Sequence, residues 1–237
     1  MLDTLTYILL GIFDATAAVL LILKLYMLPV KEYRFKIISF AIFIALFSYL
    51  MRMLLNVPKI DLPSQYILFV LFLRFGMQVK THIASFIAGA GICAYAIIQM
   101  TIFYVYDWMD LIHVGILSEN NGLYLYFFQT SCIAITLLLS ILLSKFNFGF
   151  SFIIKPPHDF FSKENYLTRR NVMLLLGSIV SLLTVSVTVL LLYSSNPLGL
   201  LIIAAISFII SFYFSGRSDK DDIRKAIEAY SDKNKVG

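Results

Sequence analysis

Residues 198–214 read LGLLIIAAISFIISFYF, a stretch without a single charged side chain. The apolar residues form a continuous run rather than the alternation of apolar and polar residues that is typical of a membrane β-strand. Hydrocarbon provides no hydrogen-bonding partner for backbone N–H and C=O groups, whereas a helix satisfies those groups within itself. The stretch is therefore predicted to be a helix that crosses a lipid bilayer.

The rest of the chain has the same apolar character. Of its 237 residues, 60% are hydrophobic and only 14% are charged, and the mean hydropathy is +0.86. A soluble domain of this size could not bury so much apolar surface. We therefore predict an all-α, polytopic protein of the cell membrane, with the lipid bilayer as its main partner.

Seven stretches are apolar enough to be predicted as membrane spans, which need about 20 residues each. The third is the shortest, and a Ser-Ser-Asn-Pro turn signal joins the last two. The predicted spans are residues 5–27, 35–55, 62–75, 83–106, 122–143, 171–193 and 197–214. Together with their short connections they form one membrane domain, residues 1–216.

Two segments outside the predicted spans are large enough to interpret. In the loop 145–170, phenylalanines alternate around Gly149, which predicts a segment at headgroup depth in the membrane interface. These phenylalanines are Phe146, Phe148, Phe150 and Phe152. Residues 217–237 are predicted to form a short polar tail helix, which either continues the seventh span or pairs weakly with a second copy or a partner.

The distribution of basic residues predicts the orientation of the chain. With seven spans, all of the 19 Lys and Arg residues except Arg52 and Lys59 fall on one side of the membrane. Basic residues concentrate in cytoplasmic loops, so the N-terminus is predicted to be outside and the C-terminus inside. Removing the short third span would place basic segments on both sides, which favours keeping it.

Asp14 and Arg52, in the first and second predicted spans, are candidate ligand-binding residues. Asp14 lies in the first span, where a carboxylate is costly and is expected to face the helix bundle. It is either a hydrated or hydrogen-bonded structural acid or a contact for a ligand or ion. Arg52 lies one turn inside the second span, from where it could reach the headgroups. Because the two depths are similar, we predict that Arg52 pairs with Asp14.

The outer loop after the fourth span contains the other candidate ligand-binding residues. They are Asp107, Trp108, Asp110 and Glu119, an acidic and aromatic group. One interpretation is an interfacial aromatic belt next to a solvated loop. The other is the rim of a site for an external peptide or a cationic ligand.

Catalytic and metal sites are not predicted from this sequence. His82 and Cys93 suggest a nucleophile and its base, but on one straight helix they would be roughly 16 Å apart, beyond proton-transfer distance. The sequence has no cluster of metal ligands, and we expect no cofactor. The basic residues follow the predicted topology, so nucleic-acid binding is not expected.

Residues 74–80, which read RFGMQVK and lead into a small-residue fourth span, resemble the membrane sensor domain of AgrC-like peptide-sensing histidine kinases of Gram-positive bacteria. The N-out topology, the short third span and the closing helical pair contribute to this resemblance, which covers about residues 5–230. In that family, a helix bearing a phosphorylated His and an ATP-binding domain follow the last span. Residues 218–237 contain no His, so kinase activity is not implied.

These observations indicate three candidate functions. The favoured one is a non-catalytic sensor or signalling accessory that binds an extracellular peptide or hydrophobic ligand and acts through a homodimer or a membrane histidine kinase. The second is a small transporter or substrate-binding membrane subunit that works with a separate ATPase. The third is an AgrB-like membrane peptidase, which the spacing of His82 and Cys93 disfavours.

Overall fold

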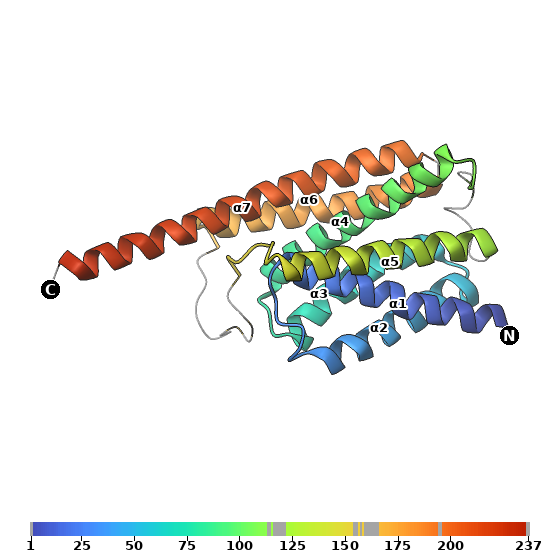
Figure 1. Ribbon diagram of the computed structural model, residues 1–237, viewed down its shortest axis with the longest axis horizontal. Coiled ribbons are helices and arrows are strands. Elements are labelled where there is room, and N and C mark those ends of the chain that lie inside the picture. The colour runs from blue at the N-terminus through green and yellow to red at the C-terminus, as the bar shows by residue number, and fades with distance from the viewer. Residues whose placement is uncertain are drawn as a thin grey trace.

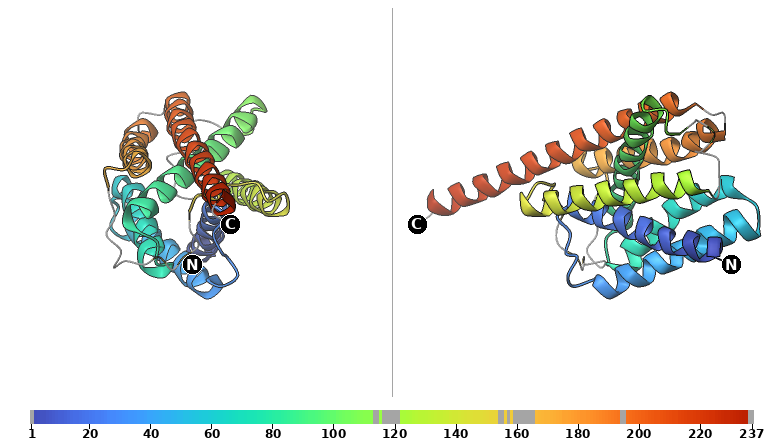
Figure 2. Two further views of the ribbon diagram at one scale, coloured as in Figure 1. Left: turned by 90° about the vertical axis from the view of Figure 1, so that its left-hand side faces the viewer. Right: turned by 45° about the vertical axis from the view of Figure 1, so that its right-hand side comes forward.

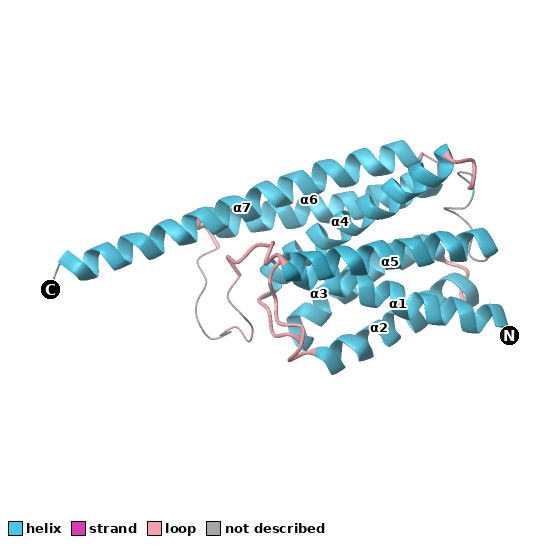
Figure 3. Cartoon of the chain, in the orientation of Figure 1, coloured by secondary structure: helices cyan, strands magenta, loops and turns pink. Residues whose placement is uncertain are grey.

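The computed structural model describes residues 2–112, 115, 122–153, 156, 158, 166–193 and 196–235. All regular secondary structure in these ranges is helical, which confirms the predicted all-α fold (Figures 1 and 3). The α-helices are α1 (Leu2–Leu25), α2 (Arg34–Tyr49), α3 (Pro58–Leu71), α4 (Thr81–Trp108), α5 (Leu123–Lys145), α6 (Arg169–Tyr193) and α7 (Pro197–Lys235). Two short π-helices, η1 (Leu50–Leu54) and η2 (Phe72–Gly76), directly continue α2 and α3.

Six of the described helices are long and apolar enough to cross a membrane, which supports a multi-pass membrane protein. They are Thr4–Leu25, Arg34–Leu54, Thr81–Trp108, Leu123–Lys145, Arg170–Leu191 and Pro197–Arg224. The predicted third span corresponds to α3, which has 14 residues before it passes into η2. It is shorter than the roughly 20 residues of a full span. The seventh span and the orientation of the chain therefore stay predictions.

Successive helices run in alternating directions along one bundle (Figure 1). Helix α1 begins at one end, here called the N-terminal end, and α7 finishes beyond the opposite end. The opposite end is here called the basic end, because Lys24, Lys80 and Lys145 all lie at helix boundaries there. The two chain termini thus lie on opposite sides of the bundle.

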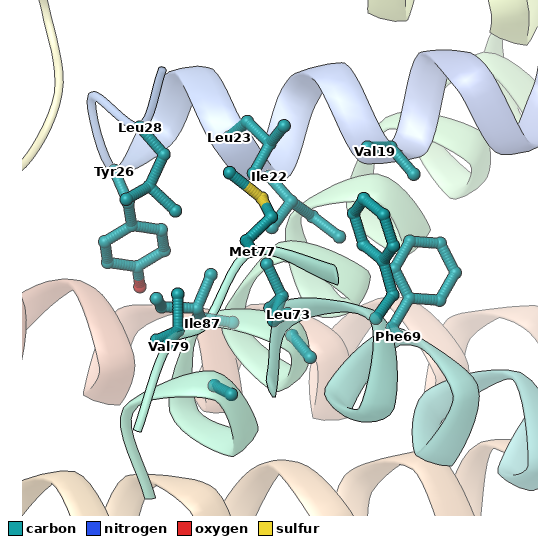
Figure 4. Packing of buried hydrophobic residues seen from close by; sticks show 14 of the residues in the cluster. Val19, Ile22, Leu23, Tyr26, Leu28, Phe69, Leu73, Met77, Val79 and Ile87 are labelled. Carbon is teal, nitrogen blue, oxygen red and sulfur yellow. The ribbon is translucent and has the colours of Figure 1, made fainter. Parts of the chain in front are cut away.

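Helix α4 is the centre of the packing. It contacts α6 and α7 on one side, and α1, α3 and α5 on the other, while α1 also packs against α2 and α5 (Figure 2). Small residues allow this close packing, since a Cβ atom on Gly91 would lie only 2.2 Å from Ile22 Cγ1. Figure 4 shows the main core, in which Ile22 and Leu23 of α1 meet residues of α3 and α4.

A short strap, residues 149–153, packs into the basic end of the bundle. This position differs from the interfacial one predicted for the segment. Phe150 and Phe152 are buried, and both ring systems lie against Tyr26 of α1. The Phe150 N–H donates a 2.9 Å hydrogen bond to the Leu25 carbonyl. A Cβ atom on Gly149 would lie 2.9 Å from that same oxygen, so glycine permits this approach. The interfacial prediction was thus wrong for Phe150 and Phe152, because the Leu25 carbonyl at the end of α1 and the Tyr26 ring hold this segment inside the bundle.

The other two phenylalanines of the alternating group behave differently. Phe146 and Phe148 are exposed on the surface of the bundle, at the end of α5. Exposed aromatic side chains at a helix end are compatible with the predicted headgroup contact. The four phenylalanines therefore form an outward-facing pair before Gly149 and a core-facing pair after it.

Helix α7 is a single helix of 39 residues. Its apolar first half packs in the bundle, and its charged second half projects beyond the basic end (Figure 1). The predicted tail helix is therefore the direct continuation of the last span. At 1.5 Å per residue, the stretch from Ala204 to Lys235 is about 46 Å long.

Candidate ligand cavity

A cavity of about 260 Å³ lies inside the helix bundle. Each of the seven labelled helices contributes to its wall, and most of the residues come from the helix halves nearest the N-terminal end. Its apolar wall includes Ile44, Phe69, Phe128 and Leu200. Its polar side chains are Tyr7, Asp14, Ser48, Arg52, Gln65, Tyr95, Gln99, Gln129, Thr184 and Thr188. An apolar cavity with a few converging polar groups is the usual form of a small-molecule site.

Asp14 is held in this cavity by a contact between two helices. The Tyr95 hydroxyl of α4 donates a hydrogen bond to Asp14 Oδ1 of α1. Asp14 is only partly buried, and it lines the cavity. Gln99 follows Tyr95 by one helical turn and therefore lies on the same wall. The carboxylate thus faces the bundle interior, as its cost in hydrocarbon predicts.

Arg52 belongs to a second polar group, centred on Asp61. Its guanidinium forms an ion pair with Asp61, whose side chain is 0% exposed. The Ser48 hydroxyl and the Gln65 amide also donate to this carboxylate, each at 2.9 Å. Tyr7 of α1 joins the group through a 3.3 Å hydrogen bond with Ser48. The group therefore links α1, α2, η1 and α3 at one side of the cavity.

The predicted ion pair between Asp14 and Arg52 was wrong, although both residues line the same cavity. Arg52 lies in η1, and the chain then turns so that the first turn of α3 presents Asp61 to it. This nearby carboxylate forms the ion pair instead of Asp14. A π-helical turn in an otherwise α-helical segment is frequent at functional sites, and η1 carries the arginine of this cavity.

The predicted acidic and aromatic rim lies away from this cavity. Asp107, Trp108 and Asp110 lie at the end of α4, and none of the three lines the cavity wall. Trp108 is 86% exposed. Asp110 has a left-handed backbone with φ of 54°, and the Leu111 N–H bonds to the Tyr106 carbonyl, so this segment forms a helix C-cap. Glu119 lies outside the described residues.

His82 and Cys93 lie in α4, about three turns apart. The Cys93 thiol lines the cavity and donates to the Ser207 hydroxyl at 3.4 Å. The His82 ring contacts the Tyr166 ring, with centroids 5.5 Å apart. The two are not brought together as nucleophile and base. In the described ranges, no group of three or more His, Cys, Asp or Glu side chains could hold a metal ion.

Sequence reasoning missed the residues that position Asp14 and Arg52. Neither Asp61 nor Tyr95 is among the candidate residues predicted from the sequence. A usable signal was present, since Asp61 and Gln65 are four residues apart and so share one helix face, as do Tyr95 and Gln99. Polar pairs at this spacing within apolar segments indicate a polar face inside the bundle.

No protein family, curated protein or solved structure matches the chain.

Proposed function

We propose that this protein is a non-catalytic membrane receptor, a signalling accessory that binds a ligand in the cavity and transmits its presence through α7. One observation carries the proposal. Leu200 and Ala204 of α7 line the cavity, and the same helix continues without interruption to Lys235. A rigid helix transmits a shift at one end to the other, so ligand binding has a direct mechanical connection to the basic end.

The basic residues support the direction of this signal. Most of the residues that line the cavity are in the half of the bundle nearest the N-terminal end, whereas Lys24, Lys80 and Lys145 lie at the other end. Under the positive-inside rule, the cavity is in the outer half of the membrane and the charged part of α7 is in the cytoplasm. An extracellular ligand then reaches the cavity, and an intracellular partner meets the tail.

The packing of α7 suits a small shift. Beyond Leu200 and Ala204, its buried face within the bundle continues with small hydroxyl residues: Ser207, Ser211, Ser215 and Ser218. Small side chains permit close helix contact without deep interlocking. Ligand binding shifts such a helix only if the ligand has different affinities for its two positions. Because Leu200 and Ala204 form part of the cavity wall, a shift of α7 changes the shape of the site and provides that difference.

The projecting part of α7 is the proposed contact for a partner. Ile223 and Ile227 are one turn apart and largely exposed. Two apolar residues on one face are the start of a helix–helix contact, with a second copy of the chain or with a membrane histidine kinase. The resemblance to AgrC-like sensor domains, in which the last span leads into a dimerisation helix, also favours such a pairing.

A distance measurement across the basic end tests the proposal. Ile227→Cys on α7 and Phe146→Cys, directly after α5, place spin labels at two exposed positions, while native Cys93 and Cys132 are buried. Ala96→Phe would fill part of the cavity from α4 and so imitate an occupied site. The matched control is Ala134→Phe, on an exposed face of α5.

We expect Ala96→Phe to shift the distance between the labels by about 1–5 Å, the range of helix translations in switching proteins. Ala134→Phe should leave the distance unchanged. Equal distance distributions in the Ala96→Phe variant and the unsubstituted pair would contradict the proposal, provided that both proteins elute as folded species in lipid nanodiscs.

Transport is the second candidate function, and the structure favours transport more than the sequence does. The intramembrane polar residues are few, but the bundle gathers Asp14, Arg52 and Asp61 around one cavity. Ionisable residues inside a membrane protein often mark a path for substrates or ions. Uptake of a bound probe into proteoliposomes would favour transport, and binding without uptake would favour the receptor.

A further inference from the structure

We infer that the cavity takes a small organic monocation, an amine with an apolar body, and that Asp14 receives its ammonium group. This inference rests on the proposed role of the cavity as a ligand site. It differs from the receptor proposal because it concerns the chemistry of the ligand and not the transmission of a signal.

The charges in the cavity wall favour a cation. Among the described residues that line it, Asp14 and Arg52 are the two with charged side chains. The positive charge of Arg52 is matched by Asp61, which lies behind the wall and is fully buried. With the pair counted as neutral, the carboxylate of Asp14 leaves one negative charge facing the cavity. Such a charge in a low-dielectric site attracts a cation strongly.

The hydrogen bonds of the two carboxylates lead to the same conclusion. A carboxylate offers about four lone-pair sites. Asp61 accepts from three side chains, which use both of its oxygens. Asp14 accepts from Tyr95 through Oδ1, its one hydrogen bond within the described part of the chain. Asp14 lines the cavity and therefore has acceptor capacity left at its wall, and an ammonium group with three N–H donors fits it.

The rest of the wall selects an organic cation over a metal ion. Ca²⁺ takes six to eight oxygen ligands, and Mg²⁺ requires an octahedral set. No suitable group of carboxylates surrounds Asp14 among the described residues. The wall instead supplies aromatic and aliphatic surface, including Phe69, Phe128 and Leu200. Aromatic rings add cation–π attraction to the burial of an apolar body, and about 260 Å³ of space matches a small molecule.

Three probes of matched shape test the inference: 2-phenylethylamine, 2-phenylethanol and 3-phenylpropionate. Their effect on the thermal unfolding of the full chain in zwitterionic nanodiscs reports binding, since a ligand that binds the folded state raises the unfolding temperature. Asp14→Asn removes the charge and keeps the shape of the side chain. Asp110→Asn, an exposed position outside the cavity where Asn also accepts the left-handed backbone, is the control.

The amine is expected to stabilise the wild-type chain and Asp110→Asn more than the alcohol does, and the carboxylate should have the weakest effect. Asp14→Asn should weaken the affinity for the amine by about tenfold or more and leave the affinity for the alcohol nearly unchanged. The inference is overturned if the amine does not stabilise the wild-type chain more than the alcohol, or if Asp14→Asn keeps the amine preference.

The two proposals fail in different ways in this design. If the amine does not stabilise the chain but Ala96→Phe shifts α7, the proposed ligand class is wrong and the receptor proposal stands. The opposite result is that the amine binds through Asp14, while neither the amine nor Ala96→Phe changes the distance to the label on α7. In that case the proposed ligand class stands and the receptor proposal is wrong.

Discussion

Tyr95 in α4 donates a hydrogen bond to the carboxylate of Asp14 in α1, inside the helix bundle. This contact joins two helices that also pack directly through Gly91 and Ile22. It holds the carboxylate at the cavity wall, where a ligand can meet it. The contact is therefore both a structural link and part of the candidate site.

Removing the hydroxyl tests that link. Tyr95→Phe is expected to destabilise the folded bundle by about 1 kcal/mol, because a hydrogen bond to a carboxylate is lost while the ring stays in place. Thermal or denaturant unfolding in lipid nanodiscs measures the loss. In an Asp14→Asn background the same substitution should cost less, and equal costs in both backgrounds would show that the two side chains are not coupled.

The ion pair between Arg52 and Asp61 should contribute more to stability than the hydrogen bond between Tyr95 and Asp14. Asp61→Asn leaves Arg52 without its buried partner, so we expect a loss of about 3 kcal/mol in the free energy of unfolding. A double-mutant cycle with Arg52→Gln should give a large coupling energy. A second cycle with Arg52→Gln and Asp14→Asn serves as the comparison, and a larger coupling there would restore the pairing that the sequence suggested.

Gly91 lies at a close approach of α1 and α4. Gly91→Ala would place a Cβ atom 2.2 Å from Ile22 Cγ1, so the helices must separate, at a cost of about 1–3 kcal/mol. Gly216→Ala is the matched control, because its new Cβ would lie 3.9 Å from the Phe150 ring. There the better helix propensity of alanine should leave stability unchanged or slightly higher. A Gly91→Ala variant as stable as its control would contradict the packing argument.

The number of spans and the orientation are open to a labelling experiment. Single cysteines at Leu123, Phe146, Leu55 and Phe75 would be exposed, while native Cys93 and Cys132 are buried. With seven spans and an external N-terminus, an impermeant thiol reagent should label positions 123 and 55 in intact cells, and positions 146 and 75 only after permeabilisation. Labelling of positions 55 and 75 from the same side would show that α3 does not cross.

The correct predictions concern properties that depend on local composition. Residues 198–214 are a long uncharged run, and hydrocarbon leaves the backbone of such a run no partner but itself, so a helix follows from the sequence alone. The six long helices were predictable for the same reason. The place of Asp14 inside the bundle was also predictable, because the alternative is an ionised group in lipid.

Contacts between distant segments could not be predicted in this way. The partner of Arg52 depends on how η1 turns the chain into α3, and the partner of Asp14 depends on which face of α4 meets α1. The burial of Phe150 and Phe152 likewise depends on how α1 lies relative to α7 and α4 at the basic end. Local sequence patterns predict helices and their faces, whereas only the packing of those faces decides which polar groups meet.

The amino-acid sequence by itself determined that this chain forms apolar helices suited to a bilayer, because that outcome depends on the solvent each segment requires. The tertiary structure alone decided that Asp14, Arg52 and the first turns of α7 enclose one cavity, because their meeting depends on the relative rotation and depth of helices far apart in the chain.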